Sequence, residues 1–437
     1  MKSGVPQTLG AKIRALRIER GLTQGELTRG EITAGLISQI ESDRVAPSFR
    51  VIQLLAEQLG IQPHELITDV ESRNLQLQIL KEARDYLHVK KGEIALALLQ
   101  QLASSQSRYI SDAELYLEMA YAKQLIGQFD EALDLYATVE HEALLQSDAV
   151  TLADCMTRQG DLYMQLGKLP LALYSYKKAL HFLQMQPNAT FLEVYNLRKN
   201  ISILLYRAGN IKQALHFAES SLSDLQADEH AEQLAETYTM LSVLYAGLTQ
   251  RDSALYYAKA AISQYESLNL TIEALDASLN YAMILRELGD CEAALAFLIP
   301  VLAHYYDWGI REGLAQVWLE RGDCECALQQ YDDASRSLER AVALLAPNTI
   351  DYAQSLLLQG KIAAATGSFA KAVKAYDEAL TILENQERHV TSIQILQALE
   401  QIYMELGEPK KALKSRERAL ALTAKTEQTR LIMSTIA

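Results

Sequence analysis

The sequence predicts an all-α protein in which a small N-terminal helical domain is followed by a right-handed helical solenoid. Two observations predict this fold class. Most of the chain repeats a short phrase of small and aromatic residues roughly every 40 residues, which is typical of stacked helix pairs. The N-terminal segment lacks that phrase and shows short amphipathic stretches separated by Gly and Pro. We expect the first domain to span residues 1–70 and an array of about nine helix pairs to span residues 71–437.

The composition limits the class of protein. Hydrophobic residues make up 49% of the 437 residues and charged residues 22%, which is typical of a folded soluble chain. No apolar run approaches the roughly 20 residues of a membrane-spanning helix, and the N-terminus lacks the apolar core of a secretory signal. We therefore expect a cytoplasmic protein without a membrane partner.

The charge is distributed unevenly along the chain. Residues 1–50 contain eight Lys or Arg and five acids, a net charge of +3, whereas the whole chain carries −14. Residues 51–437 therefore carry −17. A small basic domain suits contact with phosphates, and a large acidic body disfavours it.

Neither the cysteines nor any motif indicates metal binding or catalysis. Only Cys324 and Cys326 are close in sequence, whereas a structural zinc site usually needs two close pairs of ligands. The chain has no P-loop, no dinucleotide-binding glycine pattern and no metalloprotease or serine-hydrolase motif. We expect reduced thiols, no metal, no cofactor and no enzymatic activity.

The first domain begins with two short predicted helices. The stretch "TLGAKIRALRIERG" (residues 8–21) places apolar residues on one face and ends at Gly21. Thr23 then begins a second helix, in which Glu26 completes a capping box. Leu27 is the expected buried anchor of this helix, and Gly30 ends it. The apolar positions of the first helix are Leu9, Ile13 and Leu16.

Three further short helices are predicted to complete this domain. Thr33 caps the third helix, "AGLISQIES", which turns Ser38 and Gln39 toward solvent. The stretch "VAPSFRVIQLLAEQLGIQPHEL" supplies the last two helices. Five short helices make a very small core, but domains of this size do fold. The expected core positions are Leu36, Ile37, Ile40, Leu54, Leu55 and Leu59.

The solenoid consists of repeated pairs of helices, which we name A and B. In most copies a Gly with left-handed conformation ends helix A, and five residues later an Ala near the start of helix B allows close packing on helix A. An earlier, degenerate pair is expected around residues 80–102. The glycines are Gly127, Gly167, Gly209, Gly289, Gly367 and Gly407. The alanines are Ala132, Ala172, Ala214, Ala254, Ala294, Ala334, Ala372 and Ala412, at spacings of 38 to 42 residues.

This pattern resembles the tetratricopeptide repeat (TPR). The small residue on helix A, the Ala on helix B and a later Ala of that family appear here in two clear copies. The usual TPR period is about 34 residues, so the present units are somewhat longer. The resemblance implies a curved array whose concave face is lined by the A helices. The two copies are Gly160/Ala172/Ala179 and Gly360/Ala372/Ala379.

The first domain resembles the Cro/cI-type helix-turn-helix domain. The match lies in "LTQGEL" and "LISQIESDRVAPS", with Gln at the start of helix two, Ile-Ser-x-x-Glu in helix three and a Pro soon after. Two features depart from the family pattern. The turn "RGEITAG" is one residue shorter than usual, and Asp43 occupies the position of the usual Gly.

The resemblance implies that helix three lies in the major groove of DNA. Gln39 suits bidentate pairing with adenine, Ser38 suits a base or a phosphate, and Ala34 suits a thymine methyl group. Residues near the helix ends would contact the DNA backbone. Alternatively, Thr23, Thr33 and Glu41 are only caps and internal braces. The expected DNA-binding residues are Thr23, Gln24, Thr33, Ala34, Gly35, Ser38, Gln39, Ser42 and Arg44.

A helix-turn-helix domain joined to a TPR array resembles the RRNPP regulators of Gram-positive bacteria, which include the PlcR-like and NprR-like proteins. The resemblance implies a quorum-sensing transcription factor whose concave face binds a short, re-imported signalling peptide. It also implies a homodimer or higher homo-oligomer in which the peptide alters the spacing of the DNA-binding domains. Two alternatives remain: a Rap-like scaffold that sequesters a protein, and a repressor controlled by a protein partner.

The expected peptide-binding residues lie on the A helices. An Asn side chain can donate to and accept from a peptide backbone, and the family uses Asn in this way. Arg207 or Arg286 would pair with a carboxylate of the peptide. Alternatively, these side chains are merely solvated, and Asn200 braces a neighbouring helix. The expected residues are Asn196, Asn200, Tyr206, Arg207, Glu236, Asp276, Asn280, Met283 and Arg286.

Overall fold

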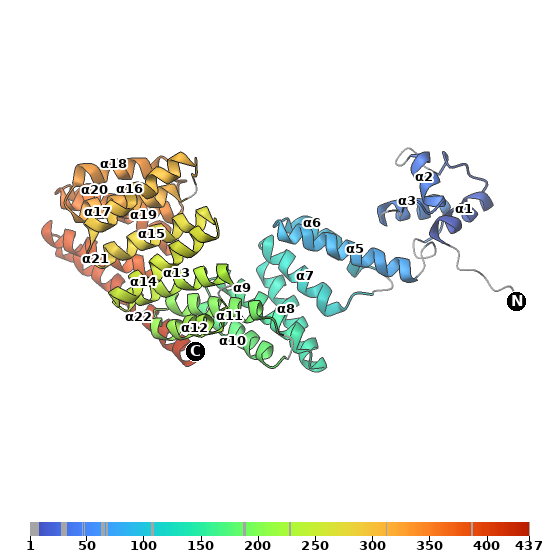
Figure 1. The fold of residues 1–437 in the computed structure, drawn as a ribbon, viewed down its shortest axis with the longest axis horizontal. Coiled ribbons are helices and arrows are strands. Elements are labelled where there is room, and N and C mark those ends of the chain that lie inside the picture. Colours follow the sequence, from blue (N-terminus) through green and yellow to red (C-terminus); the bar gives the residue numbers. More distant parts are fainter. Residues whose placement is uncertain are drawn as a thin grey trace. The chain divides into compact units, whose positions relative to one another are not determined.

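The structure is a computed structural model, and every regular element in its described part is an α-helix (Figure 1). The chain divides into two compact units, residues 1–158 and residues 159–437. Within the described part, no helix is long and apolar enough to cross a membrane. The described residues are 8–27, 33–45, 47, 49–62, 66, 69–105, 109–186, 189–226, 229–311, 313–385 and 388–436.

The N-terminal domain forms its own small core in the first unit. Thr8 caps α1 (Leu9–Glu19), and Gly21 follows it with a φ of 68°, as predicted. α1 crosses α2 (Ala34–Glu41) so closely that a Cβ at Gly10 would lie 2.1 Å from the Ile40 carbonyl oxygen. The buried residues of the core are Leu9, Ile13, Leu27, Ile37, Ile40, Ile52, Leu55, Ala56, Leu59 and Leu66.

The third predicted helix is confirmed as α2, whereas for the second predicted helix only the capping box is confirmed. Residues 24–27 form a turn, in which Thr23 and Glu26 make the reciprocal bonds of a capping box and Leu27 is 1% exposed. Thr33 caps α2 by accepting a hydrogen bond from the Leu36 backbone N–H at 3.2 Å. Gly30, the predicted end of helix two, lies outside the described residues.

α3 (Phe49–Leu59) is the predicted fourth helix. Leu55 and Leu59 are buried in it as expected. The expectation for Leu54 is only partly met, because Leu54 is half-buried and Ile52 fills the core instead. Most of the predicted fifth helix falls outside the described residues.

Nine helix pairs follow in the described part of the chain, with odd-numbered A helices and even-numbered B helices. The first unit contains α5 (Asp69–His88), α6 (Gly92–Ala103), α7 (Asp112–Leu125) and α8 (Phe129–Gln146), and α9 (Ala149–Gln165) continues into the second unit. The next helices are α10 (Leu169–Gln184), α11 (Phe191–Arg207), α12 (Ile211–Asp224), α13 (Ala231–Gly247), α14 (Arg251–Ser267) and α15 (Thr271–Glu287). The last are α16 (Cys291–Asp307), α17 (Leu314–Ala327), α18 (Tyr331–Val342), α19 (Ile350–Ala365), α20 (Phe369–Asn385), α21 (His389–Glu405) and α22 (Pro409–Ile436).

The repeated phrase has the predicted structural role. All eight shared alanines are buried, none of them more than 2% exposed. The six predicted glycines have φ angles between 70° and 85°, so they end the A helices in the left-handed conformation. In the two repeats without this Gly, Thr249 and Gln329 adopt the same conformation, with φ angles of 59° and 62°. The turn geometry is therefore kept where its usual residue is not.

The small residues on the A helices are required by tight packing. A Cβ at Gly160 would lie 2.6 Å from Tyr176, and one at Gly360 would lie 2.2 Å from Tyr376. Both tyrosines are almost completely buried. In α11 the equivalent residue is Ser202, whose hydroxyl donates to the Ala214 carbonyl oxygen at 2.8 Å. In these three repeats the A helix thus packs directly on the N-terminal half of its B helix.

Candidate DNA-binding helix and ligand groove

α2 presents one polar face to solvent and one apolar face to the core. Ile37 and Ile40 are no more than 1% exposed. The side chains expected to contact DNA lie on the opposite face. Thr33, Ala34, Gly35, Ser38 and Gln39 are all exposed. This arrangement matches the geometry that a major-groove reading helix needs.

A buried ion pair fixes the orientation of α2. Glu41 is 8% exposed and accepts hydrogen bonds from Arg17 Nε at 2.5 Å and Arg17 Nη2 at 2.9 Å. Gln24 Nε2 donates to the same carboxylate at 2.8 Å. Burial by itself raises the pKa of Glu41, but the hydrogen bonds from Arg17 and Gln24 outweigh it and hold the pKa below its usual value. Glu41 is therefore an internal brace that joins α1, the turn after Thr23 and α2.

The other expected DNA-binding residues lie around this brace. Gln24 is half-buried, and one of its amide hydrogens is taken by Glu41. Ser42 is exposed, and its hydroxyl donates to the Ser38 carbonyl oxygen at 2.8 Å. Arg44 is exposed, and Thr23 is both exposed and engaged in the capping box. Contact of these residues with DNA stays a prediction.

Asp43 explains how the family's usual Gly is replaced. Its φ is 55°, in the left-handed region where Gly is most easily accommodated. Its carboxylate accepts from the Thr8 hydroxyl at 2.6 Å and from the Gly10 backbone N–H at 3.1 Å, at the start of α1. These bonds stabilise the first turn of α1, where backbone N–H groups lack helical partners.

In α11, α13 and α15 of the second unit, residues of similar kind recur at the same positions relative to the small residue of each helix. Ser202, Ser242 and Ala282 face their own B helices and are buried. The residue after each of them points away from the B helix. These residues are Ile203, Val243 and Met283, of which Ile203 is 40% and Met283 36% exposed. Six residues before each small residue lie Asn196, Glu236 and Asp276, and five residues after it lie Arg207, Gly247 and Glu287. One apolar row is therefore flanked by two rows that are mostly polar.

Ion pairs between neighbouring A helices engage part of this surface. Lys199 Nζ contacts Glu236 Oε2 at 2.8 Å, and Tyr195 donates to the same oxygen at 2.9 Å. Arg286 Nε contacts Glu320 Oε1 at 2.6 Å. Burial lowers the pKa of Arg286, but the Glu320 carboxylate more than offsets it and raises the pKa. Glu236 and Arg286 are thus already paired.

The remaining expected residues differ in their surroundings. Asn196 and Asp276 are exposed, and Asn280 is half-buried. Asn200 is hydrogen-bonded to the buried Tyr176. Tyr206 is 42% exposed; burial and the nearby Glu287 raise the pKa of its phenol. Five of the nine expected residues occupy the three recurring positions: Asn196, Glu236, Asp276, Met283 and Arg207. The other four occupy two further shared positions, Asn200 with Asn280 and Tyr206 with Arg286.

Comparison with known proteins supports the assignment of both the N-terminal domain and the helical array. Residues 13–66 match the helix-turn-helix family model, and residues 313–385 and 395–431 match two tetratricopeptide repeat models. No curated protein matches the chain in sequence.

Solved structures with the same fold cover most of the chain. The apo form of RapI superimposes with a TM-score of 0.58 at 14% identity, over 81% of this chain and 99% of RapI. A Rap protein complexed with competence and sporulation factor gives 0.55 at 14% identity, over 81% and 99%. The apo form of the quorum sensor NprR from B. thuringiensis gives 0.55 at 15% identity, over 86% and 97%. At such identities the likeness concerns the fold.

The chain is a helix-turn-helix protein with a tetratricopeptide array. The domain make-up of an RRNPP-type regulator, expected from the sequence, is confirmed together with the all-α solenoid fold. The helix-turn-helix domain supports DNA-binding regulation as its role.

Two charged residues of the TPR array were missed by sequence reasoning. Asp323 on α17 and Lys361 on α19 form an ion pair at 2.6 Å. Each directly follows a small residue, Gly322 or Gly360, as Ile203 follows Ser202 in α11. They could have been found by applying the same repeat positions to the A helices after α15. The row that is apolar in α11 to α15 is therefore charged in α17 and α19.

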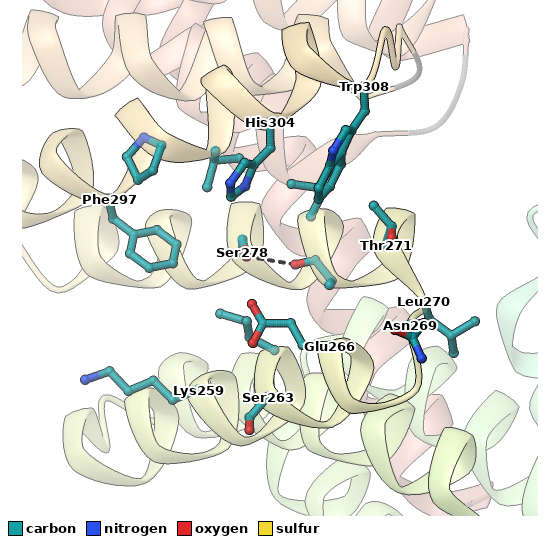
Figure 2. A pocket seen from close by; sticks show the side chains of 15 residues that line it. Lys259, Ser263, Glu266, Asn269, Leu270, Thr271, Ser278, Phe297, His304 and Trp308 are labelled. Atoms are coloured by element: carbon teal, nitrogen blue, oxygen red, sulfur yellow. Dashed lines mark hydrogen bonds between the residues drawn. The ribbon is translucent and has the colours of Figure 1, made fainter.

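A cavity of about 500 Å³ is lined by residues of α14, α15 and α16. Figure 2 shows Phe297 and His304 of α16 and Trp308 at its C-cap on one side, Lys259 and Glu266 of α14 on the other, and α15 between them. The rings of His304 and Trp308 stack with centroids 5.0 Å apart. None of the expected peptide-binding residues lines this cavity. It is therefore distinct from the A-helix surface described above.

Proposed function

We propose that this protein is a transcriptional regulator whose TPR array binds a short signalling peptide and thereby changes the DNA affinity of its helix-turn-helix domain. The DNA-binding part is supported by α2, whose exposed polar face is held in position by the buried Arg17–Glu41 pair. The proposal includes no catalytic step.

The observation that carries peptide binding is the repeated register of α11, α13 and α15. An extended peptide turns alternate side chains to opposite faces and exposes its backbone N–H and C=O groups between them. The row of Ile203, Val243 and Met283 provides apolar contacts for side chains on one face. Asn196 and Asn280, which lie on the N-terminal side of that row, are positioned to satisfy the backbone.

The proposed coupling follows from the repeat architecture. Each repeat contacts mainly its neighbours, so a small rotation at each interface accumulates along the array. A peptide that contacts several A helices would change these rotations together. Two chains in a homodimer would place their α2 helices in half-sites about 34 Å apart, one turn of DNA. A change in this spacing would alter DNA affinity, with a coupling free energy of about 1–3 kcal/mol.

The experiment that tests this function is DNA binding by the purified full-length protein. Fragments from the regions flanking its own gene would be titrated at several salt concentrations, because binding to phosphates weakens as salt rises. Synthetic peptides from small secreted reading frames next to the gene would then be added. We expect one fragment to bind specifically and one peptide to change its affinity at least fivefold.

The possible results discriminate among a peptide-controlled regulator, a regulator controlled by a protein partner, and a sequestering scaffold. Specific binding that no peptide alters would contradict the peptide-sensing part and favour control by a protein partner. Absence of specific DNA binding under every condition would contradict the whole proposal and favour a sequestering scaffold. Mass measurement in solution, with and without peptide, would establish whether the change in affinity accompanies a change in oligomeric state.

A further inference from the structure

The last helix of the array is longer than its position requires. α22 contains 28 residues, whereas the other B helices with printed bounds contain 12 to 18. Its partner α21 contains 17 residues and runs beside it. Roughly three turns at the C-terminal end of α22 therefore extend beyond the helix pair to which α22 belongs.

These extra turns contact the beginning of the second unit. Lys177 Nζ of α10 donates to the Ile436 carbonyl oxygen at 2.8 Å. The Asn210 side chain donates to the Arg430 carbonyl oxygen at 3.1 Å and accepts from Arg430 Nε at 3.4 Å. A helix leaves its last carbonyl groups without partners, and a Lys side chain is a common solution.

One apolar side chain anchors this contact. Met433 is completely buried, with 0% exposure, although it lies three residues before the end of the helix. Its neighbours Leu431 and Ile432 are 67% and 42% exposed. An isolated helix end would leave all three residues in water. The buried Met433 therefore marks the face of α22 that packs against the start of the unit.

This contact differs in kind from the others in the array. It joins residues 220 and 259 positions apart, whereas a solenoid is otherwise built from contacts between neighbouring repeats. It connects the last helix with α10 and with the turn between α11 and α12, so it closes the second unit on itself (Figure 1). We infer that this contact restrains the width of the A-helix surface.

Like charges also repel each other between the beginning and the end of the second unit. Arg207 is the last residue of α11, three residues before Asn210, and Arg388 directly precedes α21. Burial and the positive charge of Arg388 both lower the pKa of Arg207, so the two guanidinium groups repel each other. A single buried side chain and a few polar bonds work against this repulsion. We therefore expect this contact to open more readily than the rest of the array.

We propose that residues 426–436 form a latch that opens and closes the second unit by docking on α10 and on the turn before α12. The latch exists whether or not a peptide is the ligand. Its consequence rests on the proposed function: opening would allow the A helices to move apart and admit a ligand, and closing would retain it. The latch would thus regulate the proposed groove from a site outside it.

Hydrogen exchange of the full-length protein tests the latch without DNA or peptide. In Met433→Asp, a buried apolar side chain is replaced by a charge, so we expect residues 426–436 to exchange about tenfold faster than in the parent. Leu431→Asp is the matched control, because it adds the same charge two residues away at an exposed position. The control is expected to exchange within about twofold of the parent.

Two further variants keep the test independent of a folding defect. Asn210→Ala removes both bonds to Arg430 from a turn and is expected to accelerate exchange of residues 426–436 about threefold. Arg388→Gln removes the repulsion and is expected to slow it. In all variants, unchanged exchange in α13 and α14 would show that the array is intact.

The opposite results would overturn the latch. If Met433→Asp exchanges no faster than Leu431→Asp, Met433 does not anchor a docked segment. If residues 426–436 of the parent exchange at the rate of an unprotected helix end, the segment is not docked in solution. Either result leaves the proposed DNA and peptide binding untouched. Conversely, a protein that binds neither DNA nor peptide can still show the latch.

Discussion

Arg17 and Glu41 form a bidentate ion pair within the helix-turn-helix domain. Arg17 donates from Nε and Nη2 to both oxygens of Glu41, at 2.5 and 2.9 Å, and both side chains are largely buried, 12% and 4% exposed. This bidentate geometry is the most favourable one for an Arg–carboxylate pair. Because the pair joins α1 to the C-terminal end of α2, it determines how the exposed face of α2 is presented.

Replacing Glu41 with Gln is therefore expected to destabilise the domain by about 3 kcal/mol, since it leaves the Arg17 charge buried without its partner. Glu19, which is exposed on α1, provides the control: Glu19→Gln is expected to change stability by less than about 0.5 kcal/mol. Hydrogen exchange of α1 and α2 would give the local free energy of opening. Equal effects of the two substitutions would contradict the role of the brace.

The same pair predicts a pH dependence. The pKa of Glu41 is lower in the folded protein than in the unfolded chain, where it is about 4.3. A carboxylate with a lowered pKa stabilises the fold above its unfolded value, and this contribution is lost as the pH falls through the folded value. We expect the opening free energy of α1 and α2 to fall below about pH 5. In Glu41→Gln that part of the decrease should be missing.

α2 is expected to read DNA through Gln39. Gln39→Ala should weaken binding to the operator by about 1–3 kcal/mol and relax the base preference at one position. Arg44→Ala is the comparison, because a phosphate contact should weaken all sequences similarly and reduce the salt dependence. Fluorescence anisotropy with operator variants would separate the two. Unchanged affinity and base preference in Gln39→Ala would show that another residue reads the bases.

Gly360 is expected to be intolerant of any side chain. Its Cβ would lie 2.2 Å from the buried ring of Tyr376, so Gly360→Ala should destabilise α19 and α20 by about 3 kcal/mol. At Gly367 nothing lies within 4 Å and only the φ of 74° is unfavourable, so Gly367→Ala should cost about 1 kcal/mol. The double variant Gly360→Ala/Tyr376→Leu should recover part of the loss. Hydrogen exchange of α19 and α20 would give the local opening free energy of all three variants.

The parts of the fold that were predicted depend on local sequence. Gly21, the Thr23–Glu26 capping box and the buried alanines were identified because turns, caps and helix periodicity are determined by residues close in the chain. The left-handed turns at Thr249 and Gln329 were not identified, because neither residue is a Gly. There the packing of the helix pair, rather than the intrinsic preference of the residue, determines the turn.

The parts that were not predicted depend on contacts between distant residues. Arg17 carries the same charge as its exposed neighbours, and nothing in its local sequence identifies Glu41 as its partner. The pairing of Arg286 with Glu320 likewise depends on the position of one repeat against the next. The contact between Asn210 and Arg430 spans 220 positions and follows only from the curvature of the whole array. Local patterns contain no information about that curvature.

The last prediction concerns the asparagines of the TPR array. Asn196 is exposed on α11 and Asn280 is half-buried on α15, so Asn196→Ala/Asn280→Ala should abolish the response of DNA binding to the peptide. DNA affinity without peptide should stay unchanged. Asn200→Ala is the informative control, because Asn200 is bonded to the buried Tyr176 and its loss should lower stability by about 1 kcal/mol. If Asn200→Ala abolished the response without loss of stability, Asn200 would be a ligand contact rather than a brace. A full response in the double variant would place the peptide elsewhere on the protein.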